Sequence, residues 1–349
     1  RNKAFSMRWF GFGFNAFGQI CVHEKSVKVA GRDVANEVKV NSPTELSGRS
    51  GCCSQISQIK ACWSRRASLH LIGESKTTSQ SNCASRGQTL LLFDTNKRRL
   101  QYHTLNSCII LLSLIGDRPL LNLPLVPGGY IATKPPLYRP LAPDLKAKSL
   151  ALGAEHAILL CATGAVYTWG LGSHGQLGHG GLTSEEEPKA VEALWGMPMS
   201  CVATGGWHSV CISDGGDLYV WGWNESGQLG LPSRGLRKAA QQQKPQEGEK
   251  QEEVFISIQA FPALLDVTPS CEISTVSCGS RHTAAVTTTG DLYTWGWGEY
   301  GQLGHHTLIS SDEPQRVEYF RKQQMRVVDV VCGTWNTFAA VVKEEVACS

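Results

Sequence analysis

The chain has 349 residues, 42% of them hydrophobic, and a formal net charge of only +3, so it can bury a large core and is not strongly basic or acidic overall. Its 36 glycines exceed the usual share of about 7%, and its charged fraction of 18% is below the usual quarter, which predicts many tight turns and few long solvated helices. The 13 cysteines lack C-x-x-C spacing and are odd in number, which argues against a zinc module or a complete disulfide framework and favours free thiols in a reducing compartment.

Charge is distributed unevenly along the chain. Residues 1–150 hold 21 Lys and Arg against 8 Asp and Glu, whereas residues 151–349 hold 12 against 22. This asymmetry predicts a basic arc opposite an acidic arc, which would suit docking to chromatin or to a charged partner. The alternative is that short basic clusters, such as Arg65-Arg66 and Lys97-Arg98-Arg99, are ordinary solvated faces, and contact with DNA stays open.

The first residues contain neither an initiator methionine nor an apolar signal core, so Met7 is a candidate for the true start and residues 1–6 for an artefact of the gene model. The longest apolar run, Cys108 to Ile115, is far shorter than the roughly 18 residues that a membrane span needs. We therefore expect a soluble chain without a membrane segment.

Residues 9–20 contain one half of a motif that recurs in full further along the chain. Phe12-Gly13 is followed, six residues after Phe12, by Gly18-Gln19-Ile20, and no Gly-x-x-His segment precedes it. Residues 326–342 hold the other half, because Gly333-Thr-Trp-Asn336 begins a hairpin that no Trp-Gly follows. The two halves predict a ring closed by pairing of the chain ends, which leaves no open sheet edge.

The pattern is degenerate in residues 21–149. Ile59 to Ser64 is similar to a hairpin start, with Ser in place of His. Residues 135–143 contain four prolines and should be extended. This segment either bridges two blades or presents Tyr138 and Arg139 as a candidate partner-binding epitope.

Three full copies of the motif follow, each in the order Gly-x-x-His, Trp-Gly, Gly-Gln-Leu-Gly. In every copy the His precedes the Trp by 13 residues, and the Trp precedes the first Gly of Gly-Gln-Leu-Gly by six. The positions are His156, Trp169, Gly175 and Gly178 in residues 150–190; His208, Trp221, Gly227 and Gly230 in residues 203–231; and His282, Trp295, Gly301 and Gly304 in residues 276–320. A fixed spacing repeated three times indicates a structural unit.

Each copy predicts a β-hairpin followed by an outer strand. Between His208 and Trp221, two β-rich runs flank Asp214-Gly215, which we interpret as a two-residue hairpin turn. Pro188 and Pro314 end acidic runs after two of the copies and suit an outer edge strand, which can lack one ladder N–H.

The spacing of the copies predicts the architecture. His156 and His208 are 52 residues apart, and His208 and His282 are 74 apart with an insertion, which we place at residues 232–254 as a mobile loop. A four-stranded blade of about 50 residues gives roughly seven blades in this chain. We therefore expect an all-β protein: a single domain over residues 1–349, a seven-bladed β-propeller of four-stranded antiparallel blades that stays monomeric.

The repeated residues have structural interpretations that outweigh chemical ones. The three histidines should lie around a ring and fix blades by hydrogen bonds, whereas metal ligands would have to converge on one point. The tryptophans should pack between adjacent sheets, with partner anchoring as the alternative. The glycines of Gly-Gln-Leu-Gly should occupy left-handed turns.

No set of catalytic residues is present. The two G-x-G-x-x-G matches at residues 170–175 and 296–301 lack the following helix that a phosphate site needs, and no nucleophile, base and orienting group occur together. We therefore expect no enzymatic activity and no cofactor.

These motifs at this spacing resemble the regulator-of-chromosome-condensation repeat family. Residues 9–14, 138–143, 206–210, 221–229 and 317–320 are similar to one vertebrate member in particular. That resemblance implies a seven-bladed propeller in the nucleus, associated with chromosomes, with the cytosol as a second location. It also implies a JmjC-type oxygenase (a histone demethylase) as partner, with links to histone methylation, transcriptional repression and chromosome segregation.

The resemblance leaves two other functions to weigh. Guanine-nucleotide exchange on a small GTPase is the alternative, because the founding family member performs it with loops inserted into the propeller. Ubiquitin transfer, as in ligases that carry this propeller, would need an appended catalytic domain for which the ring leaves no room.

Overall fold

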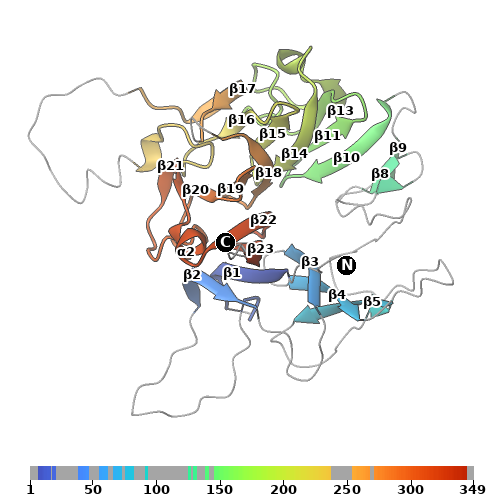
Figure 1. Cartoon of the computed structure of the whole chain (residues 1–349). Coiled ribbons are helices and arrows are strands. Elements are labelled where there is room, and N and C mark those ends of the chain that lie inside the picture. Colours follow the sequence, from blue (N-terminus) through green and yellow to red (C-terminus); the bar gives the residue numbers. More distant parts are fainter. Residues whose placement is uncertain are drawn as a thin grey trace, which may run out of the picture.

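The computed structural model describes residues 7–16, 18–20, 38–46, 55–61, 66–72, 75–81, 91–92, 125–126, 129–131, 138–140, 145–236, 254–267 and 271–343 (Figure 1). Within these ranges the chain forms five four-stranded antiparallel sheets and one three-stranded sheet. The helical elements are short, and they include η2 (Glu192–Leu194) and α2 (Glu318–Lys322). The predicted all-β class is confirmed.

Three consecutive blades follow one another in residues 147–316. Blade one comprises β10 (Ala147–Leu152), β11 (His156–Cys161), β12 (Val166–Gly170) and β13 (Glu185–Ala190). Blade two comprises β14 (Met199–Thr204), β15 (His208–Ser213), β16 (Leu218–Trp223) and β17 (Ile258–Leu265). Blade three comprises β18 (Ile273–Cys278), β19 (His282–Thr287), β20 (Leu292–Gly296) and β21 (Ser311–Arg316).

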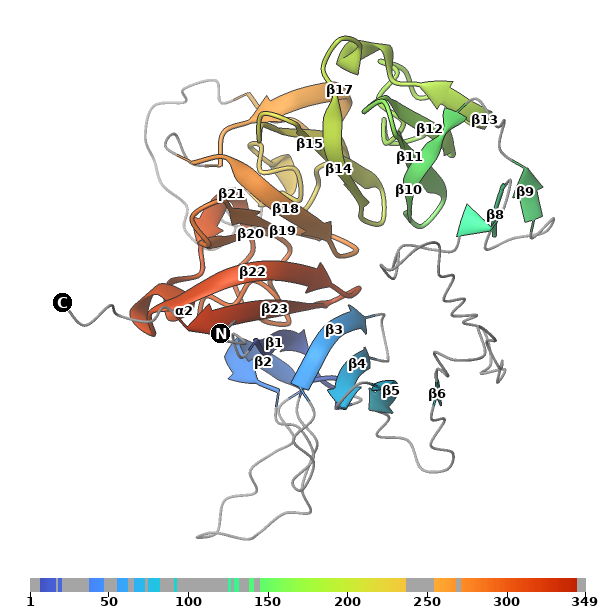
Figure 2. The ribbon, with the colours of Figure 1, turned by 45° about the vertical axis from the view of Figure 1, so that its right-hand side comes forward.

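The closing blade joins the two ends of the chain. It consists of β1 (Arg8–Phe14), β2 (Lys39–Glu45), β22 (Met325–Cys332) and β23 (Asn336–Lys343), in the order β2-β1-β23-β22. Strand β1 runs antiparallel to β23, with Trp9 opposite Ala340 and Phe12 opposite Thr337 (Figure 2). The predicted pairing of the two half-blades is confirmed.

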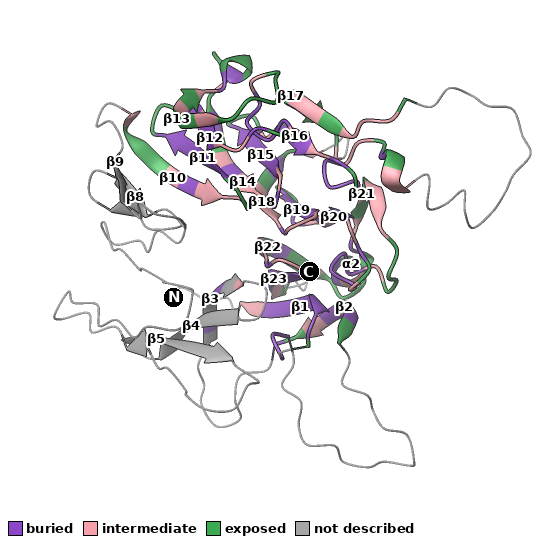
Figure 3. Ribbon diagram, turned by 180° about the vertical axis from the view of Figure 1, so that it is seen from behind, coloured by how far each residue is buried: buried purple, intermediate pink, exposed green. Residues whose placement is uncertain are grey.

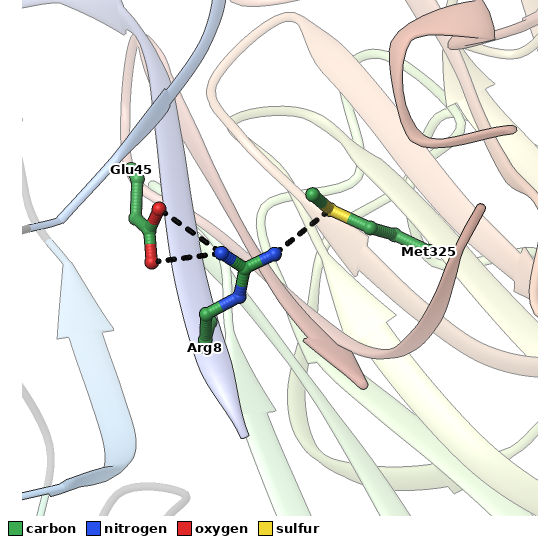
Figure 4. Close-up of polar contacts among 3 residues, drawn as sticks. All are labelled: Arg8, Glu45 and Met325. Carbon is green, nitrogen blue, oxygen red and sulfur yellow. Dashed lines mark hydrogen bonds and ion pairs between the residues drawn. The ribbon is translucent and has the colours of Figure 1, made fainter. Parts of the chain in front are cut away.

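A polar contact joins β1, β2 and β22 of this closing blade. The Arg8 guanidinium on β1 lies 3.2 Å from the Glu45 carboxylate on β2 and donates to the Met325 Sδ at 3.6 Å (Figure 4). Both charged side chains are partly exposed, so the ion pair is worth about 0–1 kcal/mol. Most of the stability of this blade therefore comes from the backbone hydrogen bonds between its strands and from its packed core.

The remaining described strands belong to the stretch where the sequence pattern is degenerate. One sheet contains β3 (Gln55–Ala61), β4 (Arg66–Ile72), β5 (Ser75–Ser81) and β6 (Leu91–Leu92). The three-stranded sheet contains β7 (Leu125–Val126), β8 (Gly129–Ile131) and β9 (Tyr138–Pro140). The count of seven blades and the single domain stay predictions.

The sheets are arranged around a central axis. The first strands of successive blades contact one another in the series β10, β14, β18, β22 and β3. The middle strands β11, β15 and β19 are buried along their whole length (Figure 3). Side chains from facing sheets form shared cores, as where Ile158 of blade one packs in one cluster with Trp221 of blade two. This arrangement is a β-propeller, as the repeat predicted.

The hairpin turn differs from the prediction of two residues. In blade two the Ser213 N–H donates to the Asp217 carbonyl oxygen at 2.9 Å, which leaves a loop of three residues, Asp214, Gly215 and Gly216. Gly216 has a φ of +87°. A type I turn completed by a left-handed glycine needs this third residue, and blades one and three have Gly164 and Gly290 there.

The predicted insertion at residues 232–254 lies only partly within the described structure. Residues 237–253 lie outside it. On the near side, the Ser233 hydroxyl donates to the Glu225 carbonyl oxygen at 2.8 Å, and the Ser233 N–H donates to the Asp312 carboxylate at 2.8 Å. The insertion therefore starts from an anchored segment and precedes β17, the outermost strand of blade two.

Candidate protein-binding face

The three repeated histidines connect each blade to the next. The Nε2 of His156 lies 2.8 Å from the Ser209 hydroxyl of blade two, and that hydroxyl donates to the Gln176 carbonyl oxygen of blade one at 2.8 Å. The next two copies repeat the arrangement as His208–Thr283–Gln228, at 3.0 and 2.7 Å, and His282–Thr337–Gln302, at 2.9 and 2.7 Å. We call each set of three residues an interblade relay.

The relay geometry determines the state of the imidazole. A hydroxyl has one proton, and here the carbonyl receives it, so the hydroxyl must accept from an Nε2–H. Each Nδ1 is buried without a hydrogen-bond partner, and burial lowers the pKa of His156, His208 and His282 to about 3. The histidines are therefore neutral and structural. Among the described residues, no group of His, Cys, Asp or Glu could hold a metal ion.

The repeated tryptophans use the same acceptor as the relay. The Trp221 Nε1–H donates to the Gln176 carbonyl oxygen at 2.9 Å, and the Trp295 Nε1–H donates to that of Gln228 at 3.1 Å. Both rings are fully buried, and Trp169 of blade one is 6% exposed. The carbonyls of Gln176 and Gln228 thus each receive both a hydroxyl and an indole from the next blade. The Gln302 carbonyl receives the Thr337 hydroxyl, and the closing blade has Phe12 in place of the Trp.

The Gly-Gln-Leu-Gly turns require their glycines for conformation and for space. The φ values are +71° and +77° at Gly175 and Gly178, +75° and +73° at Gly227 and Gly230, and +83° and +74° at Gly301 and Gly304. A Cβ at Gly178 would lie 2.9 Å from the Trp221 Nε1. The turn is therefore pressed against the tryptophan of the next blade, where only glycine fits.

A second feature of the repeat places aromatic rings at one end of the blades. In each copy the residue that follows Trp-Gly donates its N–H to the carbonyl of the residue that precedes the relay position. These pairs are Leu171 and Glu155, Trp223 and Trp207, Trp297 and Arg281, and Phe14 and Trp335, with distances of 2.8, 2.9, 2.8 and 2.8 Å. Because the pairs occupy equivalent positions in four successive blades, they line the same end of the propeller.

The rings at this end form two clusters. In the first, Trp207 and Trp223 meet edge to face with centroids 5.5 Å apart, and His174 lies 5.4 Å from Trp223. The Arg281 guanidinium of blade three lies over Trp223 at 4.9 Å, and the Trp207 Nε1–H donates to the Glu155 carboxylate at 3.3 Å. The cluster thus extends over blades one, two and three.

The second cluster covers blade three and the closing blade. Tyr300 stacks on Trp335 with centroids 5.3 Å apart at 14°, and Trp297 lies 5.3 Å from Tyr300. Phe14 meets Tyr300 at 5.1 Å, and the Lys39 ammonium lies 5.1 Å from the Tyr300 centroid. We call the two clusters together the aromatic face. Its members are Phe14, His174, Trp207, Trp223, Arg281, Trp297, Tyr300 and Trp335.

The aromatic face has the composition of a binding surface. Its four tryptophans and Tyr300 are only half-buried, so each ring presents part of its surface to solvent. Trp, Tyr and Arg are the residue types that most often dominate binding energy at protein interfaces. Rings that are already packed against one another lose little conformational entropy on binding. This end of the propeller can therefore anchor a protein partner.

Nucleophilic chemistry finds little support among the described residues. The cysteines described are free, and burial raises the pKa of Cys211 and Cys278, which disfavours the reactive thiolate. No described helix is long and apolar enough to cross a membrane.

The predicted partner-binding residues lie elsewhere. Tyr138 and Arg139 fall in β9, where Arg139 is opposite Tyr130 of β8, and their side chains lie outside the described residues. The aromatic face was missed by sequence reasoning. The sequence did contain a usable signal: the residue before the relay His changes from Glu155 to Trp207 to Arg281, while the His after it and the Gly two residues before it repeat.

Comparison with known proteins agrees with the repeat and the fold. A family model described as the regulator of chromosome condensation (RCC1) repeat matches residues 163–212, 215–286 and 289–340. The human RCC1 domain-containing protein 1 is 42% identical over 374 aligned residues, which cover 96% of this chain and 97% of that protein. The mouse protein of the same name is 41% identical, with 97% of each chain covered. The predicted resemblance to this vertebrate member is confirmed.

Among solved structures, Prp20p from Saccharomyces cerevisiae has a similar fold. It is 17% identical, with a TM-score of 0.63 over 98% of this chain and 93% of that one. The work on that structure also concerned its binding to Gsp1p and histones. At this identity the likeness supports the propeller fold alone.

Proposed function

This chain belongs to the RCC1 repeat family, and on that premise we propose that it is a non-catalytic propeller scaffold that binds a chromatin-modifying enzyme through its aromatic face. The partner we propose is a JmjC-type oxygenase that acts on histones, and the place of action is the nucleus. Regulation of histone methylation, transcriptional repression and chromosome segregation would follow from that partnership.

The observation that carries the proposal is the aromatic face itself. Trp207 and Trp223 are not needed to fill the interblade core, which Trp221 and Trp295 already occupy with fully buried rings. Partly exposed indoles on an otherwise structural repeat are best explained by a partner that covers them. The relay histidines are neutral and enclosed, so they support the ring and take no part in binding.

Affinity purification from nuclear extract, with quantitative mass spectrometry, tests this proposal. The tagged wild-type chain should recover a JmjC-type oxygenase, and Trp207→Ala with Trp223→Ala should recover at least tenfold less, since interface anchors often contribute about 2 kcal/mol or more. Val328→Ala is the control, because Val328 is 41% exposed on β22 and is not a member of the aromatic face. Recovery of no nuclear oxygenase by the wild type would contradict the proposal.

Guanine-nucleotide exchange is the alternative function. A nucleotide-release assay with a panel of small GTPases distinguishes it from scaffolding. Release accelerated by the wild-type chain, and lost in the Trp207→Ala, Trp223→Ala variant, would assign the same face to a GTPase instead.

A further inference from the structure

The outer strands of three blades can be compared position by position. Residues opposite the middle of the preceding strand are Lys189 in β13, Ala263 in β17 and Gln315 in β21. The residue before each is a proline: Pro188, Pro262 and Pro314. The three strands therefore have the same register, so the fold does not require the differences in residue type between them.

Strand β17 is apolar where its two counterparts are charged or small. Just before the proline stand Glu187 in β13, Phe261 in β17 and Glu313 in β21. Two residues after the proline stand Ala190, Leu264 and Arg316. Phe261 and Leu264 are each 54% exposed. An outer strand of a propeller thus presents two large apolar side chains at positions where the fold tolerates charge.

Neighbouring elements of blade one extend this apolar surface. The Phe261 ring lies against Gly180, whose N–H donates to the Ala260 carbonyl oxygen at 3.0 Å. Leu182, two residues further along, is 53% exposed.

The other end of the surface lies beside η2. Leu264 is opposite Tyr219, whose hydroxyl donates to the Met197 Sδ at 3.3 Å. Trp195 lies in the turn between η2 and Met197, and β17 packs against η2. We call Leu182, Trp195, Phe261 and Leu264 the rim patch.

Edge strands of soluble proteins are usually protected by charge, as β13 and β21 are. Single exposed apolar residues need no explanation, but four that gather on adjacent elements of two blades mark an interaction site. Pro262 lacks an N–H, so the strand is a poor template for adding a further strand at that point. The rim patch is therefore suited to side-chain contacts.

Charge around the rim patch indicates what would bind there. The carboxylates of Glu185 and Glu192 are both within electrostatic reach of His179, next to Gly180, and the exposed Asp266 follows Leu265. Lys189 is paired with Glu185 at 2.6 Å. Because that pair cancels its own charge, Glu192 and Asp266 make the border of the patch acidic, which favours a partner with Lys or Arg beside apolar side chains.

The insertion that precedes β17 cannot supply such side chains. Residues 237–253 contain no aromatic residue and no aliphatic residue larger than alanine or proline. We propose that the rim patch binds a segment of a partner protein in which basic residues alternate with large apolar ones. This surface is separate from the aromatic face and does not depend on the function proposed for it.

Fluorescence anisotropy with synthetic peptides tests the proposal. The probe is (Lys-Leu-Lys-Phe)3-amide, and the comparison peptides are (Glu-Leu-Glu-Phe)3-amide and (Lys-Ser-Lys-Ser)3-amide. The full wild-type chain should bind the probe at least tenfold more tightly than either comparison peptide. The Phe261→Glu, Leu264→Arg variant should lose at least tenfold in affinity for the probe.

This variant gives β17 the residues that β21 carries at the same register, so the blade should fold, and the added charges cancel. The Val328→Ala variant is the control, because Val328 is an exposed apolar residue of β22 outside both surfaces, and it should bind the probe as the wild type does. Equal binding of the probe by wild type and rim variant would overturn the proposal, as would preference for the acidic peptide. So would a wild-type chain that binds no peptide but dimerises through the patch in light scattering.

Discussion

The neutral relay histidines predict a steep loss of stability in acid. Their pKa is about 3 in the folded chain, against about 6.5 when unfolded. Below pH 6.5 the unfolded chain therefore takes up protons that the folded chain does not, and stability falls as the pH falls from 6.5 toward 3. Between pH 7.5 and 5.0, each histidine should lower the free energy of unfolding by about 2 kcal/mol, and three by about 6 kcal/mol.

A single substitution isolates one relay. The closing blade has Asn336 where the others have His, so His208→Asn uses a residue that this fold already accepts. The variant should lose about 4 kcal/mol between pH 7.5 and 5.0, because two of the three relays remain. Urea unfolding followed by circular dichroism at several pH values measures both slopes.

Comparing the pH dependence of the two proteins cancels the contributions of the other titrating groups. Burial also lowers the pKa of His179 and His305 and raises that of Asp329, but these residues are present in both proteins. A His208→Asn variant whose unfolding free energy has the same pH dependence as the wild type would refute the reasoning. It would mean that His208 is protonated in the folded chain.

Three further features described above can be tested by substitution. Thr283→Val leaves the His208 Nε2–H without an acceptor and should cost about 1–3 kcal/mol in urea unfolding; an unchanged midpoint would contradict the relay. Gly230→Ala should cost about 1–2 kcal/mol because φ there is +73°. Gly215→Ala should leave the melting temperature nearly unchanged, because φ there is ordinary and an added Cβ would meet no atom closer than 3.6 Å. Arg8→Ala should cost less than about 1 kcal/mol, and a larger loss would show that the ion pair on β1 is not the surface contact described.

The sequence predicted the fold wherever the repeat is exact, for a physical reason. The 13-residue interval from His208 to Trp221 is the length of one hairpin. Its first residue, His208, belongs to a relay, and its last residue, Trp221, packs in the core. The outer-strand prolines Pro188 and Pro314 were also predicted correctly, since β13 and β21 are outermost. Pro262 went unrecognised because the insertion moved it away from its turn.

Other features could not be predicted because the residue letters do not encode them. The acceptor shared by relay and indole is the backbone carbonyl of Gln176, which any residue type would offer. The three-residue hairpin loop depends on whether Asp217 pairs with Ser213, and the sequence alone does not determine this. The aromatic face could not be predicted without knowing that Trp207 and Trp223 lie at the same end of a blade.

The pairing of β1 with β23 determines when the ring can be completed during synthesis. Strand β23 begins 322 residues after β1 ends, and until it is synthesised β1 has no inner neighbour in its sheet. The same strand provides Thr337, the hydroxyl that His282 of blade three requires. Strand β1 and His282 therefore both depend on β23. A nascent chain that stops before residue 336 leaves the β1 edge exposed and the His282 imidazole without an acceptor.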